Sequence, residues 1–564
     1  MAAVLSSWCI IFVASGILGF AFIRITGWEC KKQACSLDMI LVSGLMIVNL
    51  YAQFFSIFYK VGGRACLLLF VTEFVIAGIL FYKKELKISA MLCFLKNMSI
   101  TKILVILVGI LTISLWTAQS PQHYDTYLYH AQAIRWIEEY GIVPGLGNLH
   151  NRMAYNSAFM PLQALFSLRW LTGQSYHSVN GFICCAVLIY AMTSNHLVKG
   201  ENIQTSDLFK VAAIGYVLIN RQTISSPCSD TLAMLLVLYI SIKWCEFSEQ
   251  GGKEWEPYML LGLFGIWAVT VKLSTAVCAL FAFLPFIMLI RDKKWKKAAE
   301  NILLGLVIVL PWLVRNIIIS GYLLYPYAQL DFFDVDWKMP SSVLECDSTE
   351  IMVWGRELKD ISLCNVSFFE WFPNWFEAQN PFYRVLVVLG LLSAILVFIL
   401  LLCQIVKKEY LLQNILLLFT VTGLLVWLLT APLMRYGIVY LMLPICILTE
   451  RLLRRKYNNI LKLIMLFVLI PALGSGLIIW KNIDMEIAFN QEDYLWKETE
   501  EIEWNGIRMY IPVESDQCGY YAFPSTPYST VLELIEMRGE TLDGGFRAKK
   551  DYFEKRLNNS GREW

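Results

Sequence analysis

The feature that most constrains the fold is a series of about fourteen long apolar runs, which together occupy most of the chain. A helix needs about 20 consecutive apolar residues to cross a bilayer, and the spacing of the runs predicts an all-α integral membrane protein with about 14 transmembrane helices. The runs lie near residues 3–26, 38–60, 64–82, 100–118, 177–198, 206–221, 229–246, 255–273, 274–291, 299–319, 384–407, 411–431, 433–450 and 458–480. The stretch 255–291 is expected to hold two short spans hinged at Lys272.

The composition supports this class and excludes others. Only 16% of the 564 residues are charged, against about 25% in soluble chains. The net charge of +2 provides no broad field that would attract nucleic acid. Most of the 15 cysteines lie in apolar runs, and none has the spacing of a zinc site. The first run has neither a basic region before it nor a cleavage motif, so we expect a retained span.

Basic residues between the runs predict the orientation, because loops rich in Lys and Arg stay cytoplasmic. Four such clusters fall on one side under this span count: they lie at residues 83–102, 291–297, 407–408 and 451–456. The opposite side then holds both termini and two long loops. We therefore expect a multi-pass protein of the cell inner (plasma) membrane with extracytoplasmic N- and C-termini.

This topology divides the chain into two parts. Residues 1–480 form the transmembrane part, with outer loops at 119–176 and 320–383. Residues 481–564 form a small outer C-terminal domain with α/β character, because the segment from Gly506 to Pro512 alternates like a strand.

The first outer loop begins with the most unusual motif of the sequence. Pro121 ends the preceding span, and Asp125 follows at the membrane surface among Tyr124, Tyr129 and His130. Residues 126–140 read as an amphipathic helix lying in the interface plane, and a second interfacial helix is expected at about 158–171. His150 follows a turn-rich stretch between them. Interface packing accounts for each histidine alone, because no metal-ligand spacing links them.

Charged residues from three separate spans fall at the same depth as Asp125. Lys272 ends one span, Arg315 lies beside Asn316 in the last turns of another, and Arg435 opens a third. Asp230 opens a further span, where it also fits a helix cap. Charges inside the membrane boundary by default mark a site, although each long side chain could instead snorkel to the interface. A cluster of three cations favours phosphate as the ligand.

The loop motif and the span pattern resemble those of the GT-C class of membrane glycosyltransferases, which includes protein O-mannosyltransferases and the aminoarabinose transferases of lipid A. The strings Tyr124-Asp125-Thr-Tyr-Leu-Tyr-His130 and Pro311-Trp-Leu-Val-Arg-Asn316 also resemble an uncharacterised bacterial membrane family of the same shape. GT-C enzymes often carry a second acidic residue in a later outer loop. Asp230 and the acidic run at 331–336 are both candidates for that residue here.

The resemblance implies transfer of a sugar, with inversion, from a polyprenyl-phosphate donor to a glycan or lipid acceptor during cell-envelope assembly. Asp125 would be the catalytic base, and Lys272, Arg315 and Arg435 would bind the donor phosphate. No cofactor is implied, and a divalent metal at Asp334-Val-Asp336 is a weak alternative to a solvated acidic turn. Residues implied in substrate binding are Tyr124, Tyr129, His130, His150, Asp230 and Asn316.

Three other functions fit part of the pattern. A lipid-linked sugar flippase or transporter needs polar residues at mid-membrane depth, where only Glu73 is found. A polysaccharide polymerase or ligase would share the outer site and the lipid-linked donor. A non-catalytic scaffold would use the outer loops to bind a partner. Membrane lipids surround the chain in every case.

Overall fold

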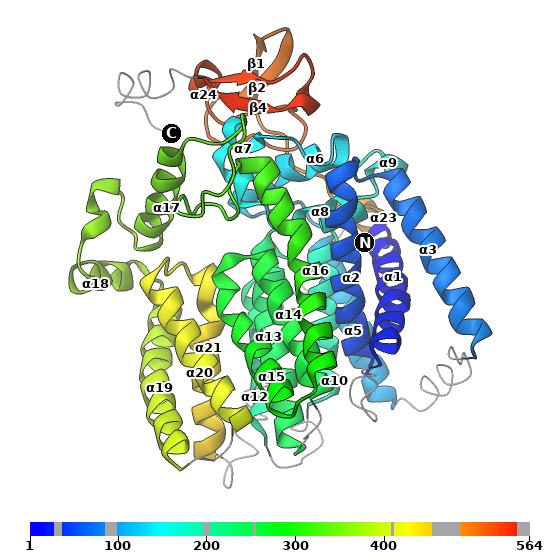
Figure 1. The fold of residues 1–564 in the computed structure, drawn as a ribbon, viewed down its shortest axis with the longest axis vertical. Helices are drawn as coiled ribbons and strands as arrows, with labels where there is room; N and C mark the ends of the chain where they lie inside the picture. The colour runs from blue at the N-terminus through cyan, green and yellow to red at the C-terminus, as the bar shows by residue number, and fades with distance from the viewer. Residues whose placement is uncertain are drawn as a thin grey trace.

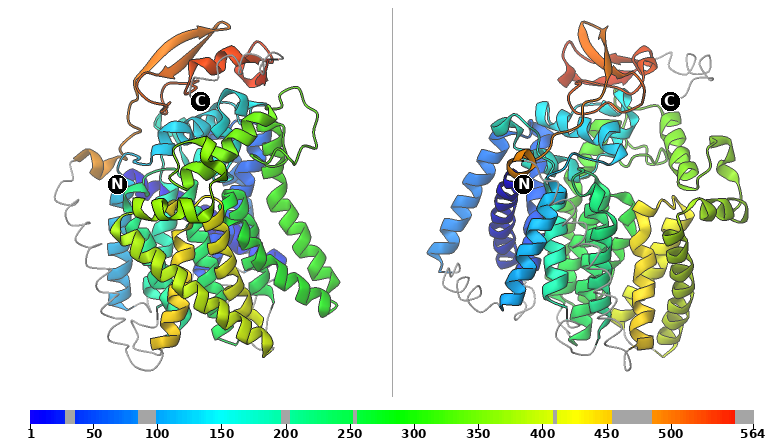
Figure 2. Two further views of the ribbon diagram at one scale, coloured as in Figure 1. Left: turned by 90° about the vertical axis from the view of Figure 1, so that its left-hand side faces the viewer. Right: turned by 180° about the vertical axis from the view of Figure 1, so that it is seen from behind.

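The computed structural model describes residues 1–27, 36–84, 99–195, 203–251, 255–407, 411–453 and 485–549. Long helices run side by side in one bundle, and the short elements of the loops and of the C-terminal segment cover one end of it (Figure 1). The strands lie above the same end in the other two views (Figure 2). The structure is therefore a helical bundle with a cap at one end.

Within the described residues, eight helices are long and apolar enough to cross a membrane. Their outward faces carry exposed Leu, Ile, Val and Phe side chains, as in α19, which is consistent with contact to lipid. The chain is thus a multi-pass membrane protein. These spans are α1 (Ala2–Thr26), α2 (Leu37–Phe58), α3 (Gly63–Tyr82), α13 (Ser229–Glu249), the continuous helix Leu273–Arg291, α16 (Trp295–Ser320), α19 (Pro381–Val406) and α20 (Leu411–Leu429).

Five further helices of the bundle coincide with expected spans but are shorter or more polar. They are α5 (Ile100–Thr117), α10 (Val179–Thr193), α12 (Thr205–Ile219), α14 (Glu256–Val271) and α21 (Met434–Leu453). The expected span at 458–480 lies outside the described residues. The count of about 14 therefore stays a prediction beyond the eight spans that length and composition support.

The helix at 255–291 is interrupted, as the sequence predicts. Lys272 adopts an extended backbone conformation after α14, and the 3₁₀ helix η4 (Leu273–Ala279) then leads into α15 (Leu280–Arg291). The C-terminal ends of α3, α15, α19 and α21 all lie at the bundle end opposite the strands (Figure 1). The described residues of the basic clusters, including Lys83, Arg291, Lys407 and Arg451, stand at these helix ends and therefore lie at the same end of the bundle.

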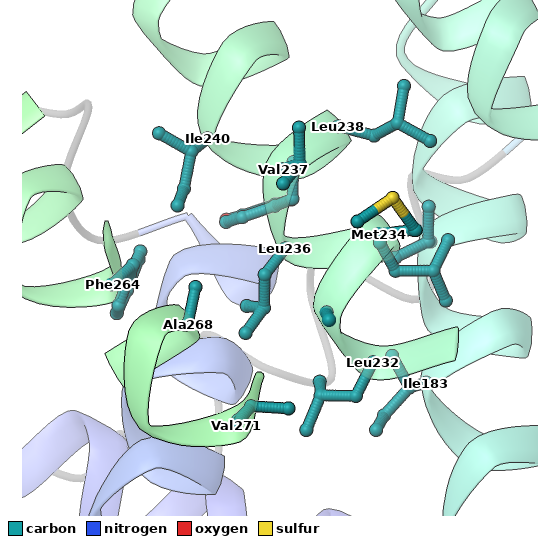
Figure 3. Packing of buried hydrophobic residues seen from close by; sticks show 14 of the residues in the cluster. Ile183, Leu232, Met234, Leu236, Val237, Leu238, Ile240, Phe264, Ala268 and Val271 are labelled. Atoms are coloured by element: carbon teal, nitrogen blue, oxygen red, sulfur yellow. The ribbon is translucent and has the colours of Figure 1, made fainter. Parts of the chain in front are cut away.

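Helix α13 is the centre of the bundle. Every residue from Ser229 to Cys245 is buried, so other helices surround it on all sides. Figure 3 shows Leu232, Leu236 and Ile240 packed against Phe264 and Ala268 of α14, and Ile183 of α10 on another side. Between membrane-spanning helices, close van der Waals packing of such side chains is a main source of stability. The first turn of α13, which carries Asp230, is thus a rigid part of the molecule.

The first outer loop forms helices where the sequence predicts them. The π-helical turn η1 (Thr126–His130) leads into α6 (Ala131–Glu139), and α8 (Phe159–Phe166) is the second expected helix. The polar face of α6 does not lie in solvent, however. Gln132 and Glu138 are buried because the C-terminal segment covers them. The remaining short elements are α7 (Leu146–Leu149), η2 (Asn151–Tyr155) and α9 (Arg169–Thr172).

The second outer loop projects beside the bundle. It contains α17 (Ser341–Gly355), η5 (Ile361–Asn365) and the aromatic helix α18 (Phe368–Ala378). Trp371 and Trp375 of α18 are buried, and the Trp375 ring lies 6.0 Å from that of Trp427 in α20. Trp371 and Trp375 therefore contribute to the packing of α18, whereas Trp354 at the end of α17 is exposed.

The C-terminal segment has the expected α/β character. Strands β1 (Thr499–Trp504) and β2 (Ile507–Pro512) form an antiparallel hairpin, whose turn Asn505-Gly506 has positive φ at both residues, as Asn-Gly hairpin turns require. The segment shares one hydrophobic cluster with both outer loops and with α16, so it packs as part of the cap. Its other elements are α23 (Met485–Phe489), α24 (Ser529–Leu534), β3 (Ile535–Met537), η6 (Leu542–Gly544) and β4 (Phe546–Ala548).

Candidate functional site

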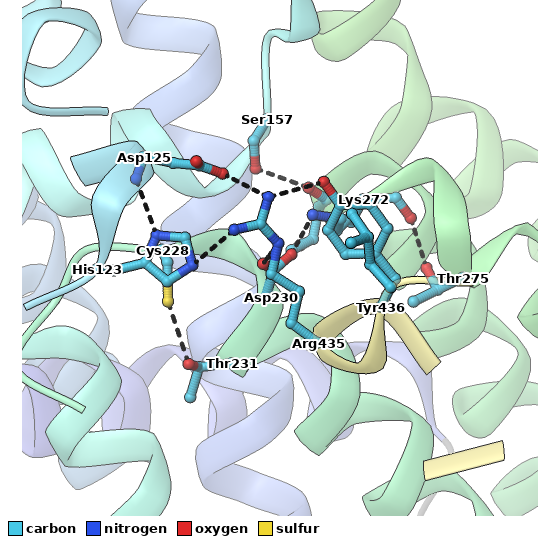
Figure 4. Close-up of polar contacts among 12 residues, drawn as sticks. His123, Asp125, Ser157, Cys228, Asp230, Thr231, Lys272, Thr275, Arg435 and Tyr436 are labelled. Atoms are coloured by element: carbon cyan, nitrogen blue, oxygen red, sulfur yellow. Dashed lines mark hydrogen bonds and ion pairs between the residues drawn. The ribbon is translucent and has the colours of Figure 1, made fainter. Parts of the chain in front are cut away.

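Four charged residues from four different elements meet where the bundle joins the cap. Asp125 precedes η1, Asp230 lies in the first turn of α13, Lys272 follows α14, and Arg435 lies in the first turn of α21. Each of them stands at a helix end, which explains their common depth. Figure 4 shows their side chains converging on one point.

The four side chains form a continuous ion-pair cluster. The Arg435 Nη2 atom lies 3.0 Å from Asp125 Oδ2, and the Arg435 Nε atom lies 3.8 Å from Asp230 Oδ2. Lys272 Nζ contacts Asp230 Oδ1 directly. Two carboxylates therefore balance two cations, and the formal charge of the cluster is zero. A buried charge is tolerated when it is paired in this way.

Two aromatic side chains complete the cluster. The Lys272 ammonium lies 3.8 Å from the centroid of the Tyr436 ring, which is a cation–π contact. The Tyr436 hydroxyl accepts a hydrogen bond of 3.3 Å from Arg435. His123 lies on the other side, with its Nε2 atom 3.3 Å from Arg435 Nη1 and its Nδ1 atom accepting from the Asp125 backbone N–H at 3.2 Å.

Backbone anchors explain why residues so distant in sequence meet. The Ser226 hydroxyl accepts from the backbone N–H groups of Gln122 and His123, each at 2.9 Å, and so fixes the start of the first loop to the segment before α13. The indole N–H groups of Trp375 and Trp427 donate to the carbonyls of Pro432 and Leu433, at 3.1 and 2.8 Å. These two bonds fix the segment that leads into Arg435.

The surroundings favour an ionised Asp125 and neutral histidines. Burial by itself would raise the pKa of Asp125, but the Arg435 guanidinium holds that pKa below its usual value. Burial lowers the pKa of His123, and it lowers the pKa of His130 to about 3 and that of His150 to about 4. At neutral pH the site thus presents one carboxylate beside uncharged imidazoles.

A cavity of about 1310 Å³ opens from the cluster towards the cap. Asp125, Lys272 and Arg435 lie on its surface, whereas Asp230 lies behind them and is only 8% exposed. One wall comes from the second loop and from α20. That wall is largely apolar and aromatic, and it includes Trp354, Trp375, Tyr383, Trp427, Leu429 and Pro432.

Arg315 lies on the same cavity but outside the ion-pair cluster. Its side chain is buried, its Nε–H donates to Asn156 Oδ1 at 3.0 Å, and its Nη1–H donates to the Ser56 hydroxyl. Both acceptors are neutral, and no carboxylate in the described residues pairs with it. The neighbouring Ser157 hydroxyl donates to the carbonyl of Val271, next to Lys272, at 2.7 Å. Arg315 is therefore a positive charge on the same cavity that no carboxylate in the described residues compensates.

Asn316 does not reach the cavity, which differs from the expected role in substrate binding. Its Oδ1 atom accepts from Asn156 Nδ2 at 2.8 Å, and its Nδ2 atom donates to the Leu323 carbonyl at 3.1 Å. The oxygen and the nitrogen of its amide thus both bond within the protein, one to Asn156 and the other to the chain after α16. Asn316 positions Asn156, which in turn holds Arg315.

Tyr124, Tyr129, His130 and His150, four of the six expected substrate-binding residues, line the cavity, whereas Asp230 does not. Tyr129 stands between His130 and His150, with ring centroids at 4.3 and 6.4 Å. His150 Nε2–H lies 3.3 Å from the Leu128 carbonyl, which leaves its buried Nδ1 without a partner. Tyr124 is half exposed at the mouth, where its hydroxyl contacts Asp516 of the C-terminal segment. The C-terminal segment thus forms part of the cavity roof.

A second polar group on the cavity was missed in the sequence. Arg152 pairs with Asp347 at 2.9 Å and with Glu350 at 3.2 Å, and the Tyr325 hydroxyl donates to Asp347 at 2.9 Å. Asp347 and Glu350 lie three residues apart on α17, so they face the same side. The spacing of Asp347 and Glu350 could have indicated a paired acidic site on one helix face, but nothing in the sequence connects α17 with Arg152.

The acidic run at 331–336 lies elsewhere, so of the two expected candidates only Asp230 lies near Asp125. Asp331 pairs with Lys338, and Asp336 pairs with Arg538 at 2.8 Å, on the side of the cap. Across the described ranges, no group of three His, Cys, Asp or Glu side chains has the arrangement of a metal site. The Asp336 carboxylate joins the second loop to the C-terminal segment.

Comparison with known proteins places the chain in a family. The family model described as "Domain of unknown function (DUF8201)" matches residues 1–442. Searches of the curated proteins and of the solved structures give no match. The matched region contains Asp125, Lys272 and Arg435, and it ends before the C-terminal segment. Because the match extends over well more than half of the chain, this protein belongs to the DUF8201 family.

Proposed function

We propose that the protein is a membrane glycosyltransferase that moves a sugar from a polyprenyl-phosphate donor to an acceptor on the outer face of the plasma membrane. One observation carries the proposal: an ionised carboxylate and two cations lie on the surface of a cavity that also has a largely apolar wall. Such a cavity suits a ligand with a lipid tail, an anionic linker and a polar head.

The positive groups account for the anionic linker. Lys272 and Arg435 balance Asp125 and Asp230, and Arg315 adds one positive charge with no carboxylate partner in the described part of the chain. A phosphodiester carries one negative charge and neutralises that excess. Guanidinium groups also match phosphate oxygens in geometry.

The apolar wall accounts for the lipid tail. Trp375, Tyr383 and Trp427 lie on helices α18, α19 and α20, which also carry exposed apolar side chains on their outer faces. A tail leaving the cavity on this side reaches the lipid phase directly. Neutral polar groups at Tyr129, His130 and His150 lie on the cavity as well, where they suit sugar hydroxyls.

The chemistry follows from these positions. Asp125 accepts the proton of the acceptor hydroxyl, and the hydroxyl oxygen forms a bond to the anomeric carbon. The bond from that carbon to the phosphate oxygen breaks, and its electron pair leaves with the polyprenyl phosphate. Cations near that oxygen stabilise its charge, which is usually the largest contribution to such a reaction. Attack opposite the leaving group inverts the anomeric centre.

The site lies at the bundle end opposite the basic clusters, which supports an extracytoplasmic reaction. The interior of the bundle favours a transferase over a transporter. In the centre of the bundle, residues 232–238 of α13 are all buried and apolar. A flippase would need polar groups at that depth.

The test uses purified protein in proteoliposomes that contain a labelled polyprenyl-phosphate sugar and a mixture of glycan acceptors. Release of polyprenyl phosphate with the label in an acceptor supports the transferase. Movement of intact donor across the bilayer with no release contradicts it and identifies a flippase. A polymerase would extend the acceptor by many units in one encounter, so the product length separates that class.

A further inference from the structure

The base and the phosphate site use the same cation in this structure. Arg435 lies 3.0 Å from the carboxylate of Asp125, the proposed base, and it is also one of the groups proposed to bind the donor phosphate. A carboxylate held by a guanidinium is a weak proton acceptor, because the cation stabilises its charged form. The observed arrangement is therefore a resting state of the site.

The hydrogen-bond donors of Arg435 are incompletely used. Its Nε–H is buried and makes no hydrogen bond within the described part of the chain. Its Nη1 atom lies 3.3 Å from His123 Nε2, and His123 Nδ1 lies 3.2 Å from the Asp125 N–H. A neutral imidazole has one acceptor nitrogen, so His123 satisfies only one of these two donors. A guanidinium in this condition gains from a ligand with several acceptor oxygens, such as a phosphate.

The two carboxylates differ in their freedom to leave Arg435. Asp230 is held by Lys272 and belongs to the rigid first turn of α13. Asp125 lies on the cavity surface just before the π-helical turn η1, and Arg435 is the only cation within ion-pair distance of it among the described residues. π-helical turns are uncommon and occur often at functional sites. Asp125 is therefore the carboxylate that an incoming anion replaces.

We propose that the donor phosphodiester displaces Asp125 from Arg435, so that binding of the donor releases the base for the acceptor. This inference rests on the proposed function. It adds an order to the reaction: the donor binds first, Asp125 then turns from Arg435 to the acceptor hydroxyl, and the acceptor is activated only in the ternary complex. Hydrolysis of the donor is limited in the same way, because the base is engaged whenever no phosphate is present.

The test measures anion binding without turnover. Full-length protein in a maltoside detergent, which contains no phosphate, is titrated with geranyl methyl phosphate by calorimetry. This probe is a soluble phosphodiester monoanion with no sugar to transfer. The variants are Asp125→Asn, Arg435→Gln and Glu357→Gln. Glu357 is an exposed carboxylate on the same cavity with no ion pair in the described residues, so its variant controls for the loss of one negative charge.

If Asp125 competes with the phosphate, removal of its charge strengthens binding. We expect Asp125→Asn to bind the probe about tenfold more tightly than the wild type, which corresponds to 1.4 kcal/mol. Arg435→Gln should lose binding, and Glu357→Gln should change it less than twofold. If Asp125→Asn binds the probe no more tightly than the wild type, and binding to the wild type still needs Arg435, the displacement of Asp125 is wrong but the phosphate site is supported. If neither the wild type nor Asp125→Asn binds the probe, the proposed phosphate site is wrong as well.

Discussion

Arg435 joins Asp125 and Asp230, with its Nη2 atom 3.0 Å from the first carboxylate and its Nε atom 3.8 Å from the second. The three residues come from the first outer loop, from the central helix and from a late helix of the bundle. A single cation thus links the proposed base to the most rigid part of the protein.

Loss of Asp125 should abolish turnover and leave the fold intact. A positioned base contributes about 10²–10⁴-fold to a rate, so Asp125→Asn should reduce kcat by at least a hundredfold in the labelled-donor assay. The amide keeps the size of the side chain, and we expect the melting temperature to stay within a few degrees. Glu357→Gln is the matched control, and equal losses in both variants would argue against a base at Asp125.

The ion pair between Lys272 and Asp230 should stabilise the folded protein. Breaking a fully buried pair costs about 3–5 kcal/mol. The cost should be smaller here, because the Lys272 side chain is 20% exposed and Asp230 keeps its 3.8 Å contact with Arg435. Lys272→Met should therefore lower the melting temperature, and the double variant with Asp230→Asn should recover most of the loss. Scanning fluorimetry of the four proteins gives the coupling. Additive effects would show that the pair is not coupled.

Acid should destabilise the cap through two buried histidines. Burial lowers the pKa of His130 to about 3 and that of His150 to about 4, whereas an unfolded chain protonates histidine near pH 6.5. Below pH 6.5 the unfolded state binds more protons than the folded state. The free energy of unfolding therefore decreases as the pH is lowered, by up to about 1.4 kcal/mol per pH unit for each ring.

The measurement compares denaturant unfolding of the wild type and His150→Gln between pH 7 and pH 5. The variant should lose stability less steeply, because one of the buried rings with a lowered pKa no longer titrates. Parallel slopes would show that His150 carries its charge in the folded state at the lower pH.

Gln132 should hold the roof of the cavity in place. Its Nε2 atom donates to the carbonyls of Gly519 and Ala522, at 3.0 and 2.7 Å. The Gln132→Leu variant leaves both carbonyls without these donors, and we expect faster amide hydrogen exchange in residues 513–528 and unchanged exchange in α13. Uniform acceleration across the bundle would instead indicate global destabilisation.

The sequence alone was sufficient for the class of the protein and for most helix positions, because long apolar runs have one solution in a bilayer. It also identified Asp125, Lys272 and Arg435 as one group, since each follows or precedes an apolar run on the same side. The break at Lys272 and the strand at Gly506–Pro512 were likewise predicted from local pattern and are confirmed.

Only the tertiary structure decided how these residues are partnered. The sequence placed Arg315 with Lys272 and Arg435, but lateral packing of helices sets Arg315 against Asn156 and Ser56 and sets the other two cations against carboxylates. It likewise brought Asp347 of the second loop to Arg152 of the first. Apolar runs determine the depth of a residue, because water and lipid act on each helix separately. The neighbours at that depth depend on which helices pack together, and that is a property of the whole chain.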